Sequence, residues 1–549
     1  MKEPLKIFCV NLQEYIEVNG GESLLEILDR IGHRLPFTPI SAFVNNKNKG
    51  LHFKVYTPKM VEFMSAESPS GNRVYIRSLC MMLFAAAKRI FPDKTLQIEH
   101  TVSNGWYCRL SPEEEITDSA VDALKNELQR LHDADLPFEL YEQRTDDVKQ
   151  IFAQEGLTDK VLLLETTRAL YTKYYRLDGI ANSFYGCLAP STGAINSFDI
   201  IPYHNGFILM GRNLNPIKQE KMFKAFTDYV SFNEIIGVSN VGELNTAVQQ
   251  GGARSLINVA EALHNNKIAR IADEITRRYD EDGCRIVLIA GPSSSGKTTS
   301  TKRLAIQLMT NLLEPRMISL DDYFVDREQT PKDADGEFDF ESLYALDLEA
   351  FNRDLQILLD GGEVELPYYN FETGKREYRG NRIKLNKRSI LLIEGIHGLN
   401  PELTAKIDSK MKFKVYVSAL TTLNIDNHNW VPTTDNRLLR RIIRDNAYRG
   451  VSAIDTIRRW PSVRRGEEKW IFPFQENADA MFNSSLLFEL GVLKERGEEV
   501  LKQVPQDCRE YAEAYRLRKF LSYFSAIDEQ YIPSTSLIRE FIGGSSFTY

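Results

Sequence analysis

The feature that most constrains this 549-residue chain is a short glycine- and serine-rich run near its middle. The run Gly291-Pro-Ser-Ser-Ser-Gly296-Lys297-Thr298 follows the apolar stretch RIVLIA and opens the helical pattern TTSTKRLAIQLM. A strand, a tight loop and a helix in this order direct loop N–H groups and the helix N-terminus at phosphates. The lysine of such a loop reaches the β- and γ-phosphates, and its Thr hydroxyl can bind Mg²⁺. The sequence therefore predicts a site for ATP and Mg²⁺, formed by Gly291, Ser293, Ser294, Ser295, Gly296, Lys297, Thr298 and Thr299.

From Asp282 onward, short apolar runs of strand length alternate with helical patterns. The runs cover residues 285–290, 389–393 and 413–417. Strands that alternate with helices are typical of a parallel, doubly wound sheet, so the fold class of this part is α/β. The polar stretch over residues 370–381 is predicted to be a long loop, a kind of segment that is often functional.

Two further patterns end in carboxylates where a parallel sheet forms its binding crevice. The run Ser389–Ile393 leads into Glu394, a candidate metal ligand beside Thr298. The run that starts at Met317 leads into Asp321 and Asp322. Phosphorylation of a hydroxyl requires a group that positions it and accepts its proton, and an Asp at this edge suits that role. The alternative is that the Asp pair caps a helix.

Arginines are concentrated between residues 437 and 465. A guanidinium can stabilise charge on a phosphoryl group in transfer, and Arg441 and Arg444 are the predicted catalytic pair. The alternative is an arginine-rich face that pairs with Asp435, Asp445 and Asp455. RNA binding by this cluster is disfavoured, because no aromatic residues are interleaved with it.

Composition excludes several classes of protein. The net charge of −8 argues against a general nucleic-acid coat. Six cysteines lie far apart and form no CxxC pair, which suits a reducing compartment. The first 18 residues carry charges where a signal peptide needs an apolar run, and no stretch approaches the roughly 18 apolar residues of a membrane span. We therefore expect a cytoplasmic protein with no membrane partner.

The N-terminal half has a different pattern. Residues 1–65 predict a small β-rich domain, with strands at 5–10, 40–44 and 52–56 and a short helix capped by Ser23. Residues 66–235 predict a second, α+β domain with helices over 78–91 and 118–131. Residues 236–281 predict a helical connector, and residues 282–549 form the phosphate-binding domain.

The segments GPSSSGKTTS, SLDDYF, EFDFESLYALD, LPYYNFETGKR, LLIEGIHGL and RLLRRIIRDNAYRG resemble the uridine kinase branch of the uridine kinase/phosphoribulokinase family. They occur in the order of that family and cover about residues 285–465. The resemblance implies Asp321 as the catalytic base, with Thr298 and Glu394 near Mg²⁺. It also implies roles for the following residues: Glu341 at the ribose hydroxyls, Tyr369, Phe340 and Phe371 near the base, and Arg441, Arg444 and Arg449 in a lid.

Two departures from that family concern the substrate. Glu341 stands where the family usually has Asp, and Gly374 falls near the place of a base-reading His of the animal enzymes. The resemblance therefore implies phosphoryl transfer more strongly than it implies a particular base.

The N-terminal half resembles the appended domains of threonyl-tRNA synthetase. Residues 1–65 look like a TGS domain, and residues 66–235 look like the editing-type domain through LFAAAKRIFPD, EHTVSNGWYCRL and DLPFELYE. The editing site of that family uses an HxxxH pair and a Cys–His pair. Here Arg77 and Met81 replace the first pair, and Cys187 lacks its His. Neither Zn²⁺ binding nor editing is expected from this half.

Together these observations predict a kinase that transfers phosphate from ATP to the 5′-hydroxyl of a nucleoside, uridine or cytidine. One alternative is a kinase for another small alcohol or a sugar phosphate. Another is a P-loop regulator that binds RNA or the ribosome, in which the N-terminal half would bind. The acidic balance of the chain and the set of Asp321 with the arginines favour the kinase. RNA binding by the N-terminal half stays an alternative that rests only on fold-level analogy, and homo-oligomerisation stays open.

Overall fold

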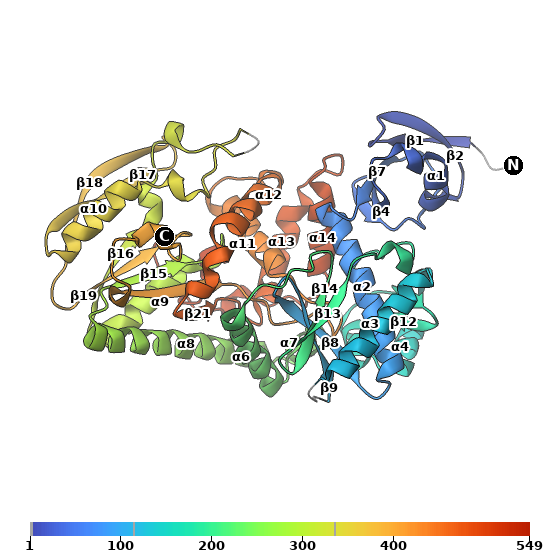
Figure 1. Ribbon diagram of the computed structural model, residues 1–549, viewed down its shortest axis with the longest axis horizontal. Helices are drawn as coiled ribbons and strands as arrows, with labels where there is room; N and C mark the ends of the chain where they lie inside the picture. Colours follow the sequence, from blue (N-terminus) through green and yellow to red (C-terminus); the bar gives the residue numbers. More distant parts are fainter. Residues whose placement is uncertain (1–3, 113–115, 334–335) are drawn as a thin grey trace.

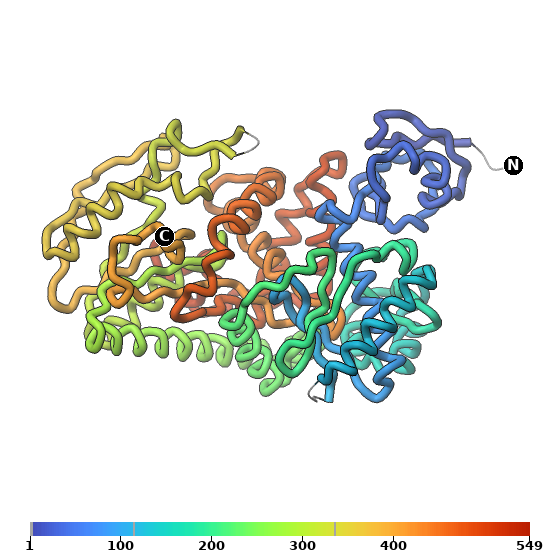
Figure 2. The backbone as a smooth tube through the Cα atoms, in the orientation of Figure 1, coloured from blue at the N-terminus to red at the C-terminus, as the bar shows by residue number. Residues whose placement is uncertain are grey.

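The computed structural model describes residues 4–112, 116–333 and 336–549 (Figures 1 and 2). The N-terminal module is a five-stranded sheet in the order β2-β1-β7-β4-β5, with helix α1 (Leu24–Ile31) packed on it. Ser23 caps α1 as predicted, in a capping box with Glu26 that satisfies N–H groups of the first turn. The strands are β1 (Pro4–Cys9), β2 (Glu14–Asn19), β4 (Pro39–Val44), β5 (Lys47–Lys49) and β7 (Met60–Ser65), with the short pair β3 (Glu22–Ser23) and β6 (Lys54–Val55). The strand predicted over 52–56 is thus only two residues long.

The second part of the chain is organised around helix α2 (Pro69–Ile90), which is buried along most of its length. The helix begins nine residues before the predicted start, because Ser68 caps it and Pro69 suits its first position. It shares one core with helix α3 (Asp118–Asp133) and the sheet β13-β14-β9-β8. The remaining elements are β8 (Thr95–Val102), β9 (Gly105–Ser111), β10 (Glu139–Arg144), α4 (Thr145–Gln154), α5 (Thr158–Thr166), β11 (Tyr171–Leu177), β12 (Ile180–Asn182), β13 (Asp199–Tyr203), β14 (Gly206–Met210) and α6 (Glu220–Ile236).

Helices α7 (Val241–Gln249) and α8 (Ala253–Asp282) lead into the C-terminal part. Helix α8 covers the second part of the helical connector predicted over residues 236–281 and runs along the lower left edge of the molecule in Figure 1. It ends at Gly283, whose φ of 76° is a left-handed conformation that glycine adopts without steric cost. The limits predicted for the domains, at residues 65, 235 and 281, stay a prediction.

The C-terminal part contains a five-stranded sheet in the order β16-β19-β15-β20-β21, and every neighbouring pair in it is parallel. This confirms the predicted α/β class. The strands are β15 (Ile286–Ala290), β16 (Glu314–Ser319), β19 (Ser389–Glu394), β20 (Lys412–Ser418) and β21 (Ala480–Asn483).

Both faces of this sheet are buried, as its nearly continuous apolar strands require. Val287 and Ile289 of β15 pack on one face, in a core shared with α8 and with α9 (Lys297–Thr310). Ile286 and Leu288 point to the opposite face, where α10 (Leu348–Leu359) packs. Because side chains alternate along a strand, one short run supplies both cores.

The polar stretch predicted to be a loop over residues 370–381 is largely not a loop. Strand β17 (Glu363–Asn370) pairs with β18 (Lys375–Lys384) in an antiparallel hairpin that projects beside α10 (Figure 1). Strand β18 has no buried residue, so its hydrophobicity gives no strand signal. Its partner strand, and not its own composition, determines its conformation.

A loop of the C-terminal part inserts into the N-terminal half, just before helix α11 (Thr433–Tyr448). Asn427 makes two of these contacts. Its carbonyl accepts a hydrogen bond from the Ile98 N–H (2.8 Å), and the Asn427 N–H donates to the Asp159 carboxylate (2.7 Å). Lys160 forms an ion pair with Asp426 (2.7 Å), and their side chains are 1% and 3% exposed. The two halves are therefore joined by buried polar contacts as well as by the chain itself.

None of the helices within the described ranges combines the length and the apolar character that crossing a lipid bilayer needs.

We predict that Lys160→Met destabilises the junction of the two halves by about 3–5 kcal/mol, because it leaves the buried Asp426 charge without its partner. Urea unfolding followed by tryptophan fluorescence would measure this, since Trp106 and Trp430 lie 5.6 Å apart at the junction. The matched control is Lys149→Met, which removes an exposed pair with Asp146 and should cost less than about 1 kcal/mol. Equal losses in the two variants would contradict the prediction.

Candidate active site

A cavity of about 390 Å³ lies at the carboxyl ends of β15, β16 and β19. This is the edge at which parallel sheets of this class bind ligands. Most of the site residues predicted from the sequence line this cavity: Ser293, Ser294, Ser295, Gly296, Lys297, Thr298, Asp321, Phe340, Glu341, Tyr369, Phe371, Glu394, Arg444 and Arg449. Gly291, Thr299 and Arg441 do not line the cavity, although the structure places them directly around it.

The loop between β15 and α9 has the backbone geometry of a phosphate cradle. Ser294 (φ 57°) and Gly296 (φ 81°) are both left-handed, which turns successive N–H groups to one side. A Cβ atom on Gly291 would lie 1.9 Å from the Val417 carbonyl oxygen, so only glycine fits there. Lys297 Nζ donates to the carbonyls of Gly291 (2.9 Å) and Pro292 (3.2 Å), and burial lowers its pKa.

Thr298 and Glu394 meet as the metal prediction requires. The Thr298 hydroxyl lies 3.1 Å from both carboxylate oxygens of Glu394, at the end of β19. Burial raises the pKa of Glu394 to about 7, although the Lys297 ammonium opposes this shift. Hydroxyl and carboxylate oxygens are the hard ligands that Mg²⁺ prefers, so these residues fit the ion.

Asp321 and Asp322 have different surroundings. They lie in a short 3₁₀ helix (Leu320–Tyr323) after β16, and neither caps an α-helix. Asp321 lines the cavity, and its enclosure by protein raises its pKa, while Lys297 and Arg449 act in the opposite direction. Asp322 instead accepts the Tyr369 N–H (3.2 Å) and so anchors β17. The Asp321 carboxylate is therefore accessible to a ligand in the cavity, whereas the Asp322 carboxylate forms a structural hydrogen bond to β17.

Aromatic rings also line the cavity. Tyr369 lies 5.1 Å from Phe371 and 5.5 Å from Phe324, measured between ring centroids. Phe324 was not singled out from the sequence, although it ends the motif SLDDYF. Glu341 also lines the cavity, and burial, with the Glu467 carboxylate as the next cause, raises its pKa to about 7.

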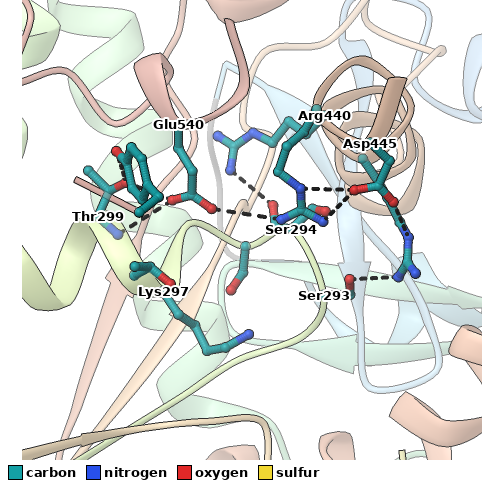
Figure 3. A network of polar contacts seen from close by, with 12 residues as sticks. Ser293, Ser294, Lys297, Thr299, Arg440, Asp445 and Glu540 are labelled. Atoms are coloured by element: carbon teal, nitrogen blue, oxygen red, sulfur yellow. Dashed lines mark hydrogen bonds and ion pairs between the residues drawn. The ribbon is translucent and has the colours of Figure 1, made fainter. Parts of the chain in front are cut away.

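The arginines of α11 divide into two groups. Arg437 and Arg440 are almost completely buried and pair with Glu467 and Glu489, in neither case with the Asp residues considered from the sequence. Arg437 donates to the Ser293 carbonyl (3.0 Å). Arg440 donates to the Ser294 carbonyl (3.4 Å), a contact drawn in Figure 3. These two guanidiniums stabilise the phosphate loop by donating hydrogen bonds to its backbone carbonyls.

The second group faces the loop and the cavity. Arg441 donates to the Ser293 hydroxyl (2.9 Å) and pairs with Asp445 (3.3 Å) (Figure 3). Arg444 also pairs with Asp445 (3.1 Å), as does the more exposed Arg449 (3.5 Å). The Asp445 carboxylate therefore holds all three guanidiniums on one side of the phosphate loop.

Glu540 is a site residue that the sequence analysis missed. It lies in the short helix α15 (Arg539–Ile542) and accepts hydrogen bonds from the Thr299 hydroxyl (2.6 Å) and N–H (3.4 Å) (Figure 3). It also approaches Arg444 (3.9 Å). The segment SLIREFIGGS gives no signal of this, because the contact joins residues 241 positions apart.

The replaced editing residues lie in the N-terminal half. Arg77 donates from Nε to the Cys187 carbonyl (3.2 Å), and Met81 is fully buried on α2. In the described ranges, no group of three His, Cys, Asp or Glu side chains could hold a metal ion.

The C-terminal part is similar to known kinases. Residues 286–486 match the model of the Phosphoribulokinase / Uridine kinase family. A uridine kinase from Brevibacillus brevis is 27% identical over 197 residues, which cover 36% of this chain and 83% of that protein. A solved structure described as a possible uridine kinase from Bacillus stearothermophilus is 22% identical, covers 36% of this chain and 88% of its own, and has a TM-score of 0.24.

The other relatives match the rest of the chain. A threonine–tRNA ligase from Carboxydothermus hydrogenoformans is 24% identical over 217 residues, 38% of this chain and 34% of the ligase. One from Halorhodospira halophila is 25% identical over 176 residues, 32% of this chain and 28% of the ligase. The chain thus spans about a third of the length of these ligases. The chain thus joins a segment, residues 286–486, that matches the Phosphoribulokinase / Uridine kinase family to an N-terminal half similar to parts of threonine–tRNA ligases.

Proposed function

We propose that this chain transfers the γ-phosphoryl group of ATP, with Mg²⁺, to the 5′-hydroxyl of a nucleoside, with uridine as the first candidate and cytidine as the second. The observation that supports this best is the arrangement within one cavity. Lys297, Glu394 and Asp321 line the same cavity as the rings of Phe324, Tyr369 and Phe371. A flat base on the rings would direct its sugar hydroxyl toward Asp321.

In the proposed reaction the substrate hydroxyl attacks the γ-phosphorus, the bond between that phosphorus and the leaving ADP oxygen breaks, and Asp321 accepts the proton. Lys297 holds the phosphates, and Arg444 stabilises charge on the phosphoryl oxygens. Bound between Thr298 and Glu394, Mg²⁺ would neutralise part of the phosphate charge. Glu341 would accept hydrogen bonds from ribose hydroxyls, and Arg441 would keep the phosphate loop in place through Ser293.

The direct test is a panel of nucleosides and sugars incubated with ATP and Mg²⁺, with the products identified by mass. Nucleoside-dependent ADP formation and a nucleoside monophosphate would support the proposal. Slow hydrolysis of ATP that ignores every acceptor would indicate a regulator instead.

One observation favours a second candidate, a phosphorylated alcohol. Arg327 lines the cavity on the side of the aromatic rings and donates to the Phe371 carbonyl. A cation there could bind a substrate phosphate. Sugar phosphates in the same panel would decide between the two classes.

We predict that Asp321→Asn lowers kcat by about 10²–10⁴, the usual contribution of a general base. Asp322→Asn is the matched control, because it removes a charge one residue away that serves only to anchor Tyr369. Its kcat should fall less than tenfold. Steady-state kinetics with the preferred acceptor would measure both, and a larger loss in Asp322→Asn would refute the assignment.

We predict that Arg444→Lys lowers kcat about tenfold or more and leaves the nucleoside KM nearly unchanged. A guanidinium can hold two phosphoryl oxygens at once, whereas an ammonium is a point charge. Arg458→Lys, on an exposed surface of α12 (Ala453–Trp470), controls for the exchange itself. A change confined to the nucleoside KM would make Arg444 a substrate-binding residue.

We predict that Mg²⁺ binds more weakly as the pH falls from 8 to 6. The carboxyl of Glu394 has a pKa of about 7 in the ligand-free protein, so it is protonated below that pH, and the ion requires the carboxylate. Binding of Mg²⁺ with a non-hydrolysable ATP analogue near pH 7 should therefore release a proton. Calorimetric titration in buffers of different ionisation enthalpy would detect it.

Glu341 has a pKa of about 7 as well, so two variants are needed. Glu394→Gln should abolish the proton release, and Glu341→Gln should retain it. The reverse pattern would assign the titration to the substrate side and contradict the metal role of Glu394.

A further inference from the structure

A second large cavity, of about 400 Å³, lies where the two N-terminal parts meet helix α14 (Tyr511–Leu521). We call it the junction cavity. It is lined by the end of the N-terminal sheet around Lys49, by α2, by the segment 184–189 and by α14. No described residue that lines it is acidic, whereas His52 and six Lys or Arg residues line it, the six being Lys49, Arg73, Arg77, Lys173, Arg516 and Lys519.

Three of these six cations have carboxylate partners, and three have none among the described residues. Arg73 pairs with Glu513 (3.0 Å), Arg516 with Asp435 (2.6 Å), and Lys173 with Glu142 (3.5 Å). No carboxylate of the described chain lies within ion-pair distance of Lys49, Arg77 or Lys519. The cavity therefore has an excess of positive charge, which favours an anion.

Arg77 is the most buried of the three, with 7% of the residue exposed. Its Nε donates to the Cys187 carbonyl, and its guanidinium lies 5.8 Å from the centre of the Tyr185 ring. A Cβ atom on residue 186 would lie 2.3 Å from the guanidinium carbon, so Gly186 leaves the space that Arg77 occupies. A guanidinium held in place while its Nη groups have no protein acceptor in the described chain is suited to phosphate oxygens.

The pKa values of Lys49 and Lys519 reflect the neighbouring positive charges. Burial lowers the pKa of Lys49, with Lys173 as the next cause, and burial followed by Arg77 lowers the pKa of Lys519. An anion among these groups would relieve the mutual repulsion.

Aromatic side chains complete the lining. Phe53, Tyr185 and Tyr515 reach the cavity from three different parts of the chain, and base–aromatic stacking is a general way to hold a nucleobase. The volume falls in the range of about 300–1,000 Å³ that is usual for small-molecule sites. We propose that the junction cavity binds a phosphorylated, nucleotide-sized ligand and that its occupancy changes the rate of phosphoryl transfer in the kinase domain.

A contact chain leads from this cavity to the phosphate loop. Arg516 holds Asp435 with two hydrogen bonds (2.6 and 2.8 Å) in the first turn of α11. The same helix contacts Ser293 through Arg437 (3.0 Å) and Arg441 (2.9 Å). Because Arg73 and Arg516 share Glu513, a phosphate that attracts either cation would compete for the contacts that hold the start of α11.

The binding test uses the full chain with Lys297→Ala, which weakens nucleotide binding at the kinase site. The probes are pyrophosphate, adenosine, and the mono- and triphosphates of adenosine, uridine and cytidine, titrated by calorimetry. We expect one nucleotide to bind with one-to-one stoichiometry and at least tenfold more tightly than pyrophosphate or adenosine. This measurement needs no kinase activity, so it stands apart from the proposed function.

The decisive protein is a double variant, Lys49→Gln with Lys519→Gln, which we call the cavity variant. It changes two side chains that have no ion-pair partner among the described residues. The cavity variant should bind the nucleotide at least tenfold more weakly and have an unchanged melting temperature. The matched control changes two exposed lysines outside the cavity, Lys54→Gln with Lys502→Gln, and should have no effect. In the otherwise unchanged protein, the cavity variant should keep its basal kinase rate and lose the response to the nucleotide.

Three outcomes would overturn the proposal. The first is no binding of any nucleotide below about 1 mM. The second is binding that the cavity variant and the control variant weaken equally. The third is a short single-stranded RNA that binds through Lys49 and Lys519 more tightly than every mononucleotide, which would make the cavity a nucleic-acid site.

Discussion

The buried ion pair between Arg437 of α11 and Glu467 of α12 is the interaction on which the kinase site depends. Both side chains are at most 1% exposed, and both also contact Ser293: Arg437 binds its carbonyl, and Glu467 accepts its N–H (3.1 Å). A phosphate loop must direct its N–H groups inward and leave its carbonyls satisfied elsewhere. Arg437 and Arg440 supply those donors from behind the loop. The same helix can then present Arg444 to the cavity.

Charges of both signs line the candidate active site: four carboxyl groups, Asp321, Glu341, Glu394 and Glu540, and four cations, Lys297, Arg327, Arg444 and Arg449. Asp321, Glu341 and Glu394 share the cavity with Lys297, and burial raises the pKa of each of the three carboxyls. Raised carboxyl pKa values of this kind are typical of functional sites. A metal ion bound to these carboxylates would interact favourably with their negative charge.

Helix α11 also joins the kinase domain to the rest of the molecule. The inserted loop before it is fixed by Lys160 and Asp159 of the N-terminal half, and its first turn is fixed by Arg516. Both anchors lie upstream of the arginines that contact the phosphate loop. The N-terminal half therefore holds the loop that leads into α11, a helix whose arginines contact the phosphate loop.

The sequence alone determined the phosphate loop and the positions of Asp321 and Glu394 at strand ends, because each is encoded in a short run of neighbouring residues. It also determined the parallel sheet, because several such apolar runs alternate with helical patterns. It did not reveal the burial of Arg437 and Arg440, the hairpin partner of β18, the contact of Glu540 with Thr299 or the junction cavity. Asp435 and Arg516 are 81 positions apart, and Arg73 and Glu513 are 440 apart. Whether a charged side chain such as Arg73 or Arg516 faces an ion-pair partner, a cavity or solvent depends on which distant segments of the chain pack beside it. Only the tertiary structure decides that.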